Sequence, residues 1–459
     1  MKNNKFLTLF LLFIFCGFGS LEAQDKSTMV SVQGRELSLS DCIELAQKNS
    51  PQLLSLQPQV DMLGLDYQAS KEAFLPSVNA SVGENVSFGR SPNKNQVYQD
   101  VSSANTSFQI GGELTIFSGG ARWYQLQKTK AALANSDYIV SETMDNIALQ
   151  VASSYIQLLL AQEMAMTAKE NLTLTEQYYE QVKEQVRLGK VAFSQQIEIE
   201  SQMGRDQLAV VETQADVSRA KRSLLLDMGV TSETDLEIEQ VSPETVVASL
   251  KKATPHNMNH EWILPRTALL QRDLELSVYD VKIAKSRYIP SLSLNGGYSN
   301  SYYYNFGDGF KGVNPDFGDQ LKHNGRSYIG VSLNIPIYNK GQVRNQIKQA
   351  KLQQLRLQGQ LIQQQYSDRR NIVLAEADLL KAEEQYRVSK ENLQLSQKAL
   401  DIADLEYRAG RISTYEWEQA RNRKLQAQAS YLQSIYTRLL RTINLTYFNT
   451  GEIPVDLTN

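Results

Sequence analysis

Cysteine, histidine and tryptophan are scarce in this chain of 459 residues, which holds two, three and three of them. Cys16 lies in an apolar segment near the N-terminus, which leaves Cys42 as the one other cysteine. A lone thiol cannot form an intrachain disulfide, so we expect Cys42 to be a small apolar residue of an amphipathic helix. Nothing in this composition requires thiol chemistry.

Neither positive nor negative charge is in large excess, because 47 lysines and arginines nearly balance 50 aspartates and glutamates, for a formal net charge of −3. No basic run interleaved with aromatic residues occurs, so a nucleic-acid partner is not expected. With 42% hydrophobic residues the chain can build a large core, which excludes a mostly disordered protein.

Catalytic motifs are missing as well. The sequence has no phosphate-binding glycine loop, nucleophile elbow or paired-cysteine motif. His256 and His260 have a spacing that suits a metal on a helix, but Pro255 precedes them and no third ligand is evident. We therefore expect no enzyme activity, no metal and no other cofactor.

Residues 1–23 are typical of an export signal, with two lysines before the apolar run 6–18. We expect the mature chain to begin at Gln24, with cleavage after Ser20 as the alternative. No later stretch has the eighteen or so consecutive apolar residues that a membrane-spanning helix needs. Any membrane crossing must therefore use strands.

The sequence repeats itself at a long period. Residues 74–78 recur as 288–292, which is 214 residues later, while 116–120 match 337–341 and 186–191 match 407–412, both 221 residues apart. We interpret the chain as two copies of one unit, 24–229 and 265–450, joined by a linker at 230–264 and followed by a tail at 451–459.

Each copy contains two runs in which apolar and polar residues alternate with the period of a strand. These runs lie at about 76–90, 106–118, 290–304 and 326–339. Each is long enough to cross a bilayer as a tilted strand, although a soluble half-buried sheet alternates in the same way. The smallest membrane barrels have eight strands, so closing a barrel would require several copies. Glu113 lies on a polar side and is expected to face the lumen.

The connection between the last two runs is rich in aromatic residues. It contains Tyr302, Tyr303, Tyr304, Phe306 and Phe310, separated by glycine and asparagine. Aromatic rings at strand ends suit a membrane interface, where one side of the ring is wet. The alternative is an ordinary surface loop.

Long heptad patterns follow the strands in both copies. Apolar or small residues step by four and three from Ile147 to Val186 and again from Ile372 to Tyr407, which predicts helices packed against other helices. An unbroken helix over 120–188 would rise about 100 Å. Gly189 and Gly410 lie where the chain must reverse. The pattern predicts two helical hairpins, 120–229 with its turn near 189 and 341–449 with its turn near 410.

Several features occur together in this sequence: the signal, the duplicated order of strands and helices, Leu-Pro-Ser at 75–77, Ile-Pro-Ile-Tyr-Asn-Lys-Gly at 335–341, and Tyr407 three residues before Gly410. In this combination the sequence resembles the TolC-like outer-membrane efflux protein family. Members of that family are the outer-membrane factors of tripartite efflux and type I secretion. The resemblance covers about residues 37–450. It implies an α+β membrane protein that forms a homotrimer in the outer-membrane lipid. Four strands per chain would make a twelve-stranded β-barrel, continuous with a twelve-helix α-barrel in the periplasm.

The resemblance also implies a passive exit duct with protein partners. These would be a periplasmic adaptor, or membrane fusion protein, and an inner-membrane resistance-nodulation-division or ABC transporter. The rival interpretation is a periplasmic coiled-coil scaffold or an adaptor protein. An adaptor would have one helical hairpin, whereas this sequence has two, each preceded by paired alternating runs.

The family closes its tunnel at the periplasmic tip with tyrosine, arginine and aspartate contacts. Matched to this sequence, the tyrosine is Tyr407 and one acidic residue is Glu416. The basic position is Ile412 here, with Arg411 adjacent, and the second acidic position is Gln419. The closing contacts are therefore altered.

In the first copy the corresponding positions are Gln195 and Glu198. Three copies of Glu198 and Glu416 would form carboxylate rings that favour cations, or both are solvated charges on a helix surface. The turns themselves carry the residues expected to contact the adaptor: Arg187, Leu188, Gly189, Lys190, Arg408 and Gly410. Alternatively, the cations Arg187, Lys190 and Arg408 only cap the carbonyl ends of their helices.

Overall fold

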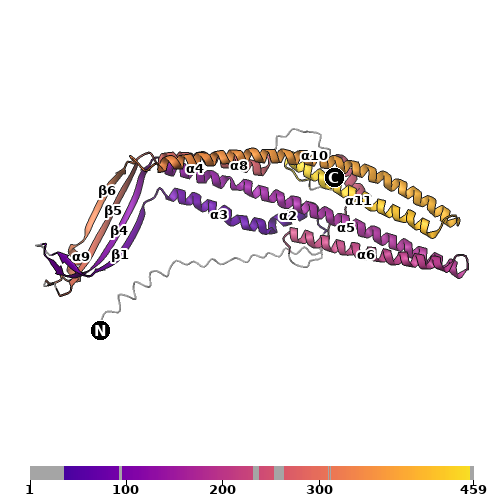
Figure 1. The fold of residues 1–459 in the computed structure, drawn as a ribbon, viewed down its shortest axis with the longest axis horizontal. Helices are drawn as coiled ribbons and strands as arrows, with labels where there is room; N and C mark the ends of the chain where they lie inside the picture. Colours follow the sequence, from indigo (N-terminus) through magenta and orange to yellow (C-terminus); the bar gives the residue numbers. More distant parts are fainter. Residues whose placement is uncertain are drawn as a thin grey trace.

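The structure is a computed structural model that describes residues 36–92, 96–230, 237–252, 263–308, 310 and 312–454. The signal expected at 1–23 and the linker residues 231–236 and 253–262, which include His256 and His260, lie outside this part of the chain. The described chain is strongly elongated, with a sheet at one end and two helical hairpins reaching to the other (Figure 1).

Four long strands and two very long helical hairpins dominate the fold. The elements are α2 (Leu39–Asn49), α3 (Pro51–Glu72), β1 (Ser77–Ser87), β2 (Arg90–Pro92), β3 (Tyr98–Asp100), β4 (Ser102–Ser118), α4 (Ala121–Ala134), α5 (Ser136–Arg187), α6 (Phe193–Asp227), α7 (Pro243–Lys252), α8 (Pro265–Ser286), β5 (Ser291–Phe306), α9 (Phe317–His323), β6 (Arg326–Asn334), α10 (Gln342–Arg408) and α11 (Thr414–Thr450).

The heptad positions account for part of what the hairpins bury. In α10, four of the five buried residues, Ala375, Leu379, Ala382 and Ala403, continue one four-and-three pattern, and α10 runs for 67 residues without a break. Small side chains at these positions let neighbouring helices approach closely.

The helix expected over 120–188 is interrupted, because α4 ends at Ala134 and α5 begins at Ser136. The carbonyl of Asn135 accepts from Tyr138 N, and Ser136 Oγ donates to Leu133 O at 2.6 Å. The Ser136 hydroxyl thus bonds to a backbone carbonyl of the preceding turn, as serine side chains do in competition with helix hydrogen bonds, so the break has a local cause.

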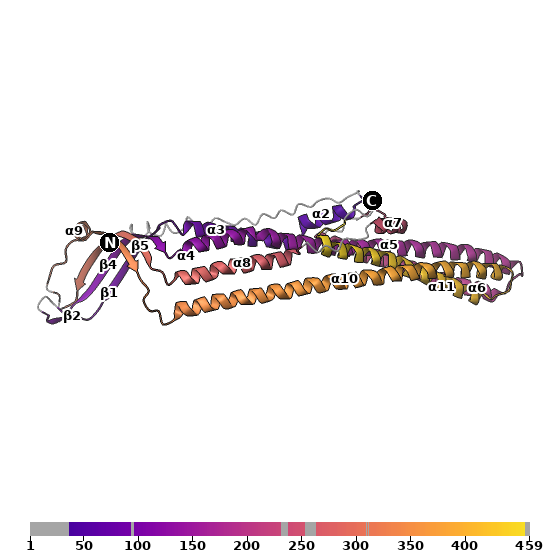
Figure 2. The ribbon, with the colours of Figure 1, turned by 90° about the horizontal axis from the view of Figure 1, so that it is seen from above.

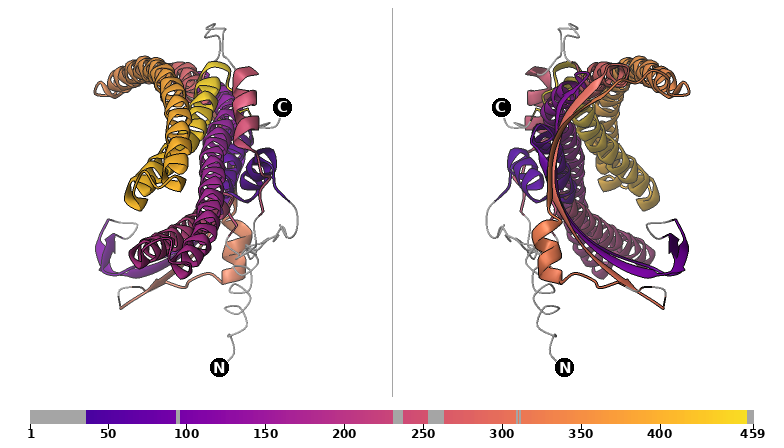
Figure 3. Two further views of the ribbon diagram at one scale, coloured as in Figure 1. Left: turned by 90° about the vertical axis from the view of Figure 1, so that its right-hand side faces the viewer. Right: turned by 90° about the vertical axis from the view of Figure 1, so that its left-hand side faces the viewer.

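The four long strands form one antiparallel sheet in the order β1-β4-β5-β6, which curves as a single arc (Figure 3). The register places Val82, Phe108 and Asn300 in one row, and Leu114, Leu294 and Val331 in another. Because side chains alternate between faces, one face of all four strands is mainly apolar and the other is polar. The edge strands are β1 and β6.

The strand ends differ from the sequence expectation. β6 ends at Asn334, before the expected 339, because Pro336 has no N–H to donate to a ladder. β1 ends at Ser87 and is followed by the small β2–β3 hairpin. β4 begins at Ser102, earlier than the expected 106.

The largest core lies midway along the molecule, where α2 and α7 pack on α5, α6 and α11. The backbone of Leu37 pairs with that of Ile238, inside the linker. Cys42 is fully buried in this core, and burial followed by the nearby Asp41 raises the pKa of its thiol to about 12. Among the described residues, no helix combines the length and apolar character required to span a lipid bilayer.

The central core should dominate the stability of the helical part. Leu158 is fully buried in it, so we expect Leu158→Ala to lower the free energy of unfolding by about 2 to 5 kcal/mol. Unfolding in denaturant, followed by circular dichroism, measures this. The adjacent exposed residue provides the control, because Gln157→Ala should change stability by less than about 0.5 kcal/mol. Equal effects of the two substitutions would contradict the assignment of the core.

Candidate functional site

The ends of the two helical hairpins lie together, at the opposite end of the molecule from the sheet (Figures 1 and 2). Gly189 and Gly410 each have φ of 68°, and the same backbone bonds surround them: Lys190 N donates to Gln185 O, and Arg411 N donates to Glu406 O. A left-handed residue is needed at such a helix end, so both glycines are explained by backbone conformation.

The cations beside these turns are exposed. Arg187 pairs with Glu184 on its own helix at 2.5 Å, and Glu184 raises the pKa of Arg187. Arg408 lies 3.8 Å from Asp404, also on its own helix. Leu188 is 51% exposed. The predicted adaptor-contacting residues therefore present an accessible surface with one apolar side chain.

An aromatic cluster joins the two hairpins just above the turns. Tyr178 of α5 stacks on Trp417 of α11 with ring centroids 4.5 Å apart, and Tyr407 lies 5.9 Å from Tyr178 and 5.8 Å from Trp417. The Tyr407 hydroxyl is 3.3 Å from Thr414 Oγ1. The predicted gate tyrosine is thus part of the contact between hairpins.

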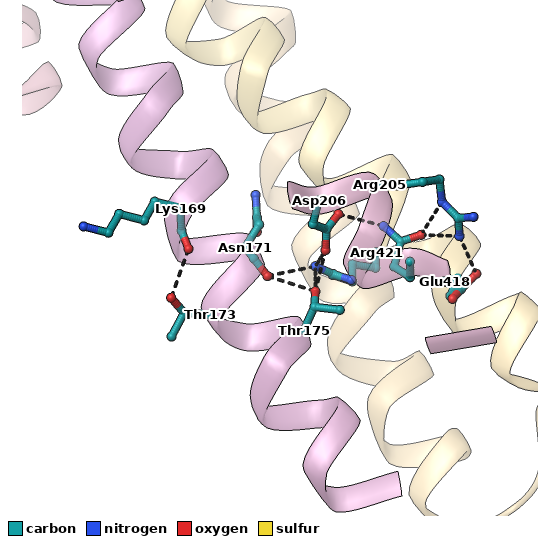
Figure 4. Close-up of polar contacts among 9 residues, drawn as sticks. Lys169, Asn171, Thr173, Thr175, Arg205, Asp206, Glu418 and Arg421 are labelled. Atoms are coloured by element: carbon teal, nitrogen blue, oxygen red, sulfur yellow. Dashed lines mark hydrogen bonds and ion pairs between the residues drawn. The ribbon is translucent and has the colours of Figure 1, made fainter. Parts of the chain in front are cut away.

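A buried ion pair forms the second contact between the hairpins, and sequence reasoning missed it. Arg421 of α11 donates to Asp206 of α6 at 2.8 Å, and the two side chains are only 8% and 9% exposed. The same guanidinium donates to the Asn171 carbonyl at 3.1 Å and to the Thr175 hydroxyl, both on α5 (Figure 4). One arginine therefore links three helices.

Further polar contacts form a second link between α6 and α11, through Arg205 and Glu418 (Figure 4). Gln202 Nε2 donates to Asp206 at 2.7 Å, and Arg205 donates to Gln202 Oε1 at 2.6 Å. Arg205 also lies 3.6 Å from Glu418, whose pKa is raised chiefly by burial. We call Asp206, Arg421, Thr175, Gln202, Arg205 and Glu418 the clamp. The sequence did contain a signal for this site. Ile199, Gln202 and Asp206 continue one heptad pattern, which places the charged Asp206 on the side of α6 that is expected to be buried.

The other predicted gate residues are not joined to one another. Glu416 accepts from Ser413 N and Oγ as part of a helix capping box, which lowers its pKa. Glu198 and Arg411 are exposed. The buried Oε1 of Gln195 has no hydrogen-bond partner within the described chain. At the far end, Glu113 lies on the polar face of the sheet, opposite Ser77 and Asn295.

In the described ranges, no group of three or more histidine, cysteine, aspartate or glutamate residues is placed to hold a metal ion.

Comparison with known proteins identifies the architecture. The family model described as outer membrane efflux protein matches residues 42–230 and 269–447, which is more than half of the chain. The chain is 23% identical over 319 residues to the outer membrane protein TolC of Vibrio cholerae, covering 68% of each chain. It is 21% identical over 407 residues to the outer membrane efflux protein BepC of Brucella suis, covering 86% of this chain and 82% of BepC.

Among solved structures, the fold is similar to the Campylobacter jejuni CmeC outer membrane channel, with a TM-score of 0.69 and 16% identity over 91% of this chain and 87% of CmeC. The family model matches two separate segments, each of which ends in one helical hairpin. The chain therefore belongs to the outer membrane efflux protein family and is an efflux channel protein of the outer membrane.

Proposed function

We propose that three copies of this chain assemble into a passive exit duct that crosses the outer membrane and extends into the periplasm. The observation that supports it most strongly is the four-stranded sheet, which has one apolar face, one polar face and unpaired edges at β1 and β6. Within a bilayer the backbone groups of such edges must find partners, and other copies of the chain provide them.

The number of copies follows from the lumen that a duct needs. Two copies would give eight strands, and side chains fill the interior of an eight-stranded barrel. Three copies give twelve strands and leave space for solvent. The polar face, with Glu113 between Ser77 and Asn295, then lines the lumen, while the apolar face contacts outer-membrane lipid. The two hairpins of each copy contribute to the periplasmic tunnel.

The tunnel mouth is proposed to lie at the hairpin ends. There the clamp and Tyr407 hold the two hairpins of one copy together, while Gln195, Glu198, Arg411 and Glu416 border the opening. Arg421 Nη1 and Glu418 Oε1 are buried without a hydrogen-bond partner in the described chain. A network satisfied only in part adds little net stability, which suits contacts that must break when the duct opens.

The proposed partners follow from this arrangement. The exposed turns, with Arg187, Leu188, Lys190 and Arg408 around the two glycines, are the proposed docking surface for a periplasmic adaptor. An inner-membrane resistance-nodulation-division or ABC transporter would supply the energy, since the duct itself has no chemistry to perform. The proposal includes no cofactor and no nucleic-acid partner.

Purification and bilayer recording test this proposal. We expect the protein to be extracted from outer membranes only with detergent, as a trimer that conducts ions across planar bilayers. A soluble periplasmic monomer would instead support the scaffold interpretation.

The apolar face of the sheet gives a sharper test. Val331 is 65% exposed on the apolar face of β6, so Val331→Arg should cost about 2 to 4 kcal/mol per chain near the bilayer centre and reduce trimer yield in the outer membrane. The next residue is the matched control, because Ser332 lies on the polar face and Ser332→Arg should leave the yield unchanged. Equal yields for both variants would contradict the assignment of the faces.

The clamp predicts how the closed duct responds to mutation. Arg421→Ala leaves Asp206 buried without its counter-charge, a loss of about 3 to 5 kcal/mol, so we expect the hairpins to separate and the single-channel conductance in planar bilayers to rise. Arg423→Ala, an exposed change two residues away on the same helix, should leave it unchanged.

Alanine at Gln195, Glu198, Tyr407 or Glu416 should also raise the conductance if these residues latch or line the mouth. Neutral Glu198→Gln and Glu416→Gln should lower cation selectivity. If conductance and selectivity were unchanged in all these variants, and conductance were also unchanged in Arg421→Ala, the assignment of the gate to this end of the molecule would be wrong.

A further inference from the structure

The β5 strand is paired along its whole length on one side only. All of β4 lies beside it, from Ser118 opposite Ser291 to Ser102 opposite Phe306. On the other side β6 pairs with residues 291–299 alone. Residues 300–306 of β5 would therefore have an open edge at the end of the sheet furthest from the helices. Such an edge invites pairing with other strands.

Three side-chain amides close this edge in place of a strand. Asn314 exchanges two hydrogen bonds with the backbone of Asn305, at 2.8 and 2.7 Å, and Gln320 exchanges two with Tyr303, both at 2.9 Å. Asn324 Nδ2 donates to Ser301 O at 2.7 Å. Residues 301, 303 and 305 are successive ladder positions, so the amides continue the pattern that β6 leaves unfinished. We call residues 312–325 the strap.

Tight packing fixes the strap against β5. The ring of Phe317 contacts that of Tyr302 edge to face at 5.0 Å, and Tyr302 lies on the apolar face of the sheet. In agreement, α9 lies on the outer, convex side of the arc (Figure 3). Gln320 is only 7% exposed, and a Cβ at Gly325 would collide with the Tyr298 hydroxyl. The strap is therefore a built part of the rim.

The strap is continuous with the free edge of β6. In the proposed trimer that edge pairs with β1 of the next copy. β1 has 11 residues and β6 has 9, so the upper end of β1 extends past β6 to the level of the strap. Both sides present exposed apolar groups there: Val313 (94% exposed) and Phe317 (51%) on the strap, and Phe88 (76%) beyond β1.

We infer that the strap is an intersubunit seal, which closes β5 within its own copy and receives the upper end of β1 of the next copy. This inference rests on the proposed trimer. At the outer rim, beyond the end of strand pairing, the strap would hold β5 through its side-chain amides and contact the neighbouring copy through apolar side chains. The contact partner is a second copy of this chain, whose Phe88 packs edge to face on its own Phe306 at 5.9 Å and still leaves most of its ring exposed.

Pairs of cysteines in the full-length protein, oxidised with copper phenanthroline in outer membranes, test the seal. The strap pairs are Val313→Cys and Phe317→Cys, each combined with Phe88→Cys. The ring pair is Leu333→Cys with Val78→Cys. Within one copy, β4 and β5 separate the ring pair by three strand spacings of about 4.8 Å, which is too far for a disulfide, so its cross-links must join two copies. The native Cys42 is fully buried.

On non-reducing SDS gels we expect covalent dimers and trimers from the ring pair and from at least one strap pair. Adding Gln320→Ala should lower the strap cross-linking rate about tenfold, through the loss of its neutral hydrogen bonds to the backbone of Tyr303 and Pro315, and leave the ring pair unchanged. Cross-links from the ring pair alone would overturn the seal and place the strap against lipid. If the ring pair also fails, the trimer itself is wrong, and the inference falls with it.

Discussion

An unpaired strand edge inside hydrocarbon is the constraint on which the rest of this structure depends. Each backbone N–H or C=O left without a partner there costs several kcal/mol, and the sheet ends at β1 on one side and β6 on the other. One chain supplies too few strands to join these edges to each other around a lumen. In the proposed duct, the single chain is therefore a segment of a larger assembly. The same constraint explains the strap, because the part of β5 that β6 does not reach is closed by amide side chains.

Two opposite solutions to polar burial appear at the two ends of the molecule. At the rim, neutral amides satisfy backbone groups almost fully, which favours a permanent contact. At the hairpin ends, Arg421 and Asp206 are buried with charge, and part of their network lacks partners. A charged and incompletely satisfied contact depends on its geometry, so a small displacement of one helix weakens it. The fold thus combines a rigid outer end with an inner end suited to rearrangement.

The sequence allowed prediction of those features that follow from periodicity. The alternation of apolar and polar residues located the strands and placed Glu113 on the polar face, because successive side chains of a strand point to opposite faces of the sheet. Heptads located the hairpins, and the repeated glycine marked both turns. Features that depend on contacts distant in sequence were missed. Asp206 and Arg421 are 215 positions apart, and Asn314 and Gln320 have no pattern that distinguishes a strap from a loop. The capping role of Glu416 was also missed, although Ser413 three residues earlier is its usual signal.

The most direct measurement is a cryo-EM density map of the detergent-extracted protein. The account predicts threefold symmetry, with β6 of each copy hydrogen-bonded to β1 of the next and the apolar face of the sheet turned toward detergent. A map of a single water-soluble chain, with that face packed against its own helices, would contradict it.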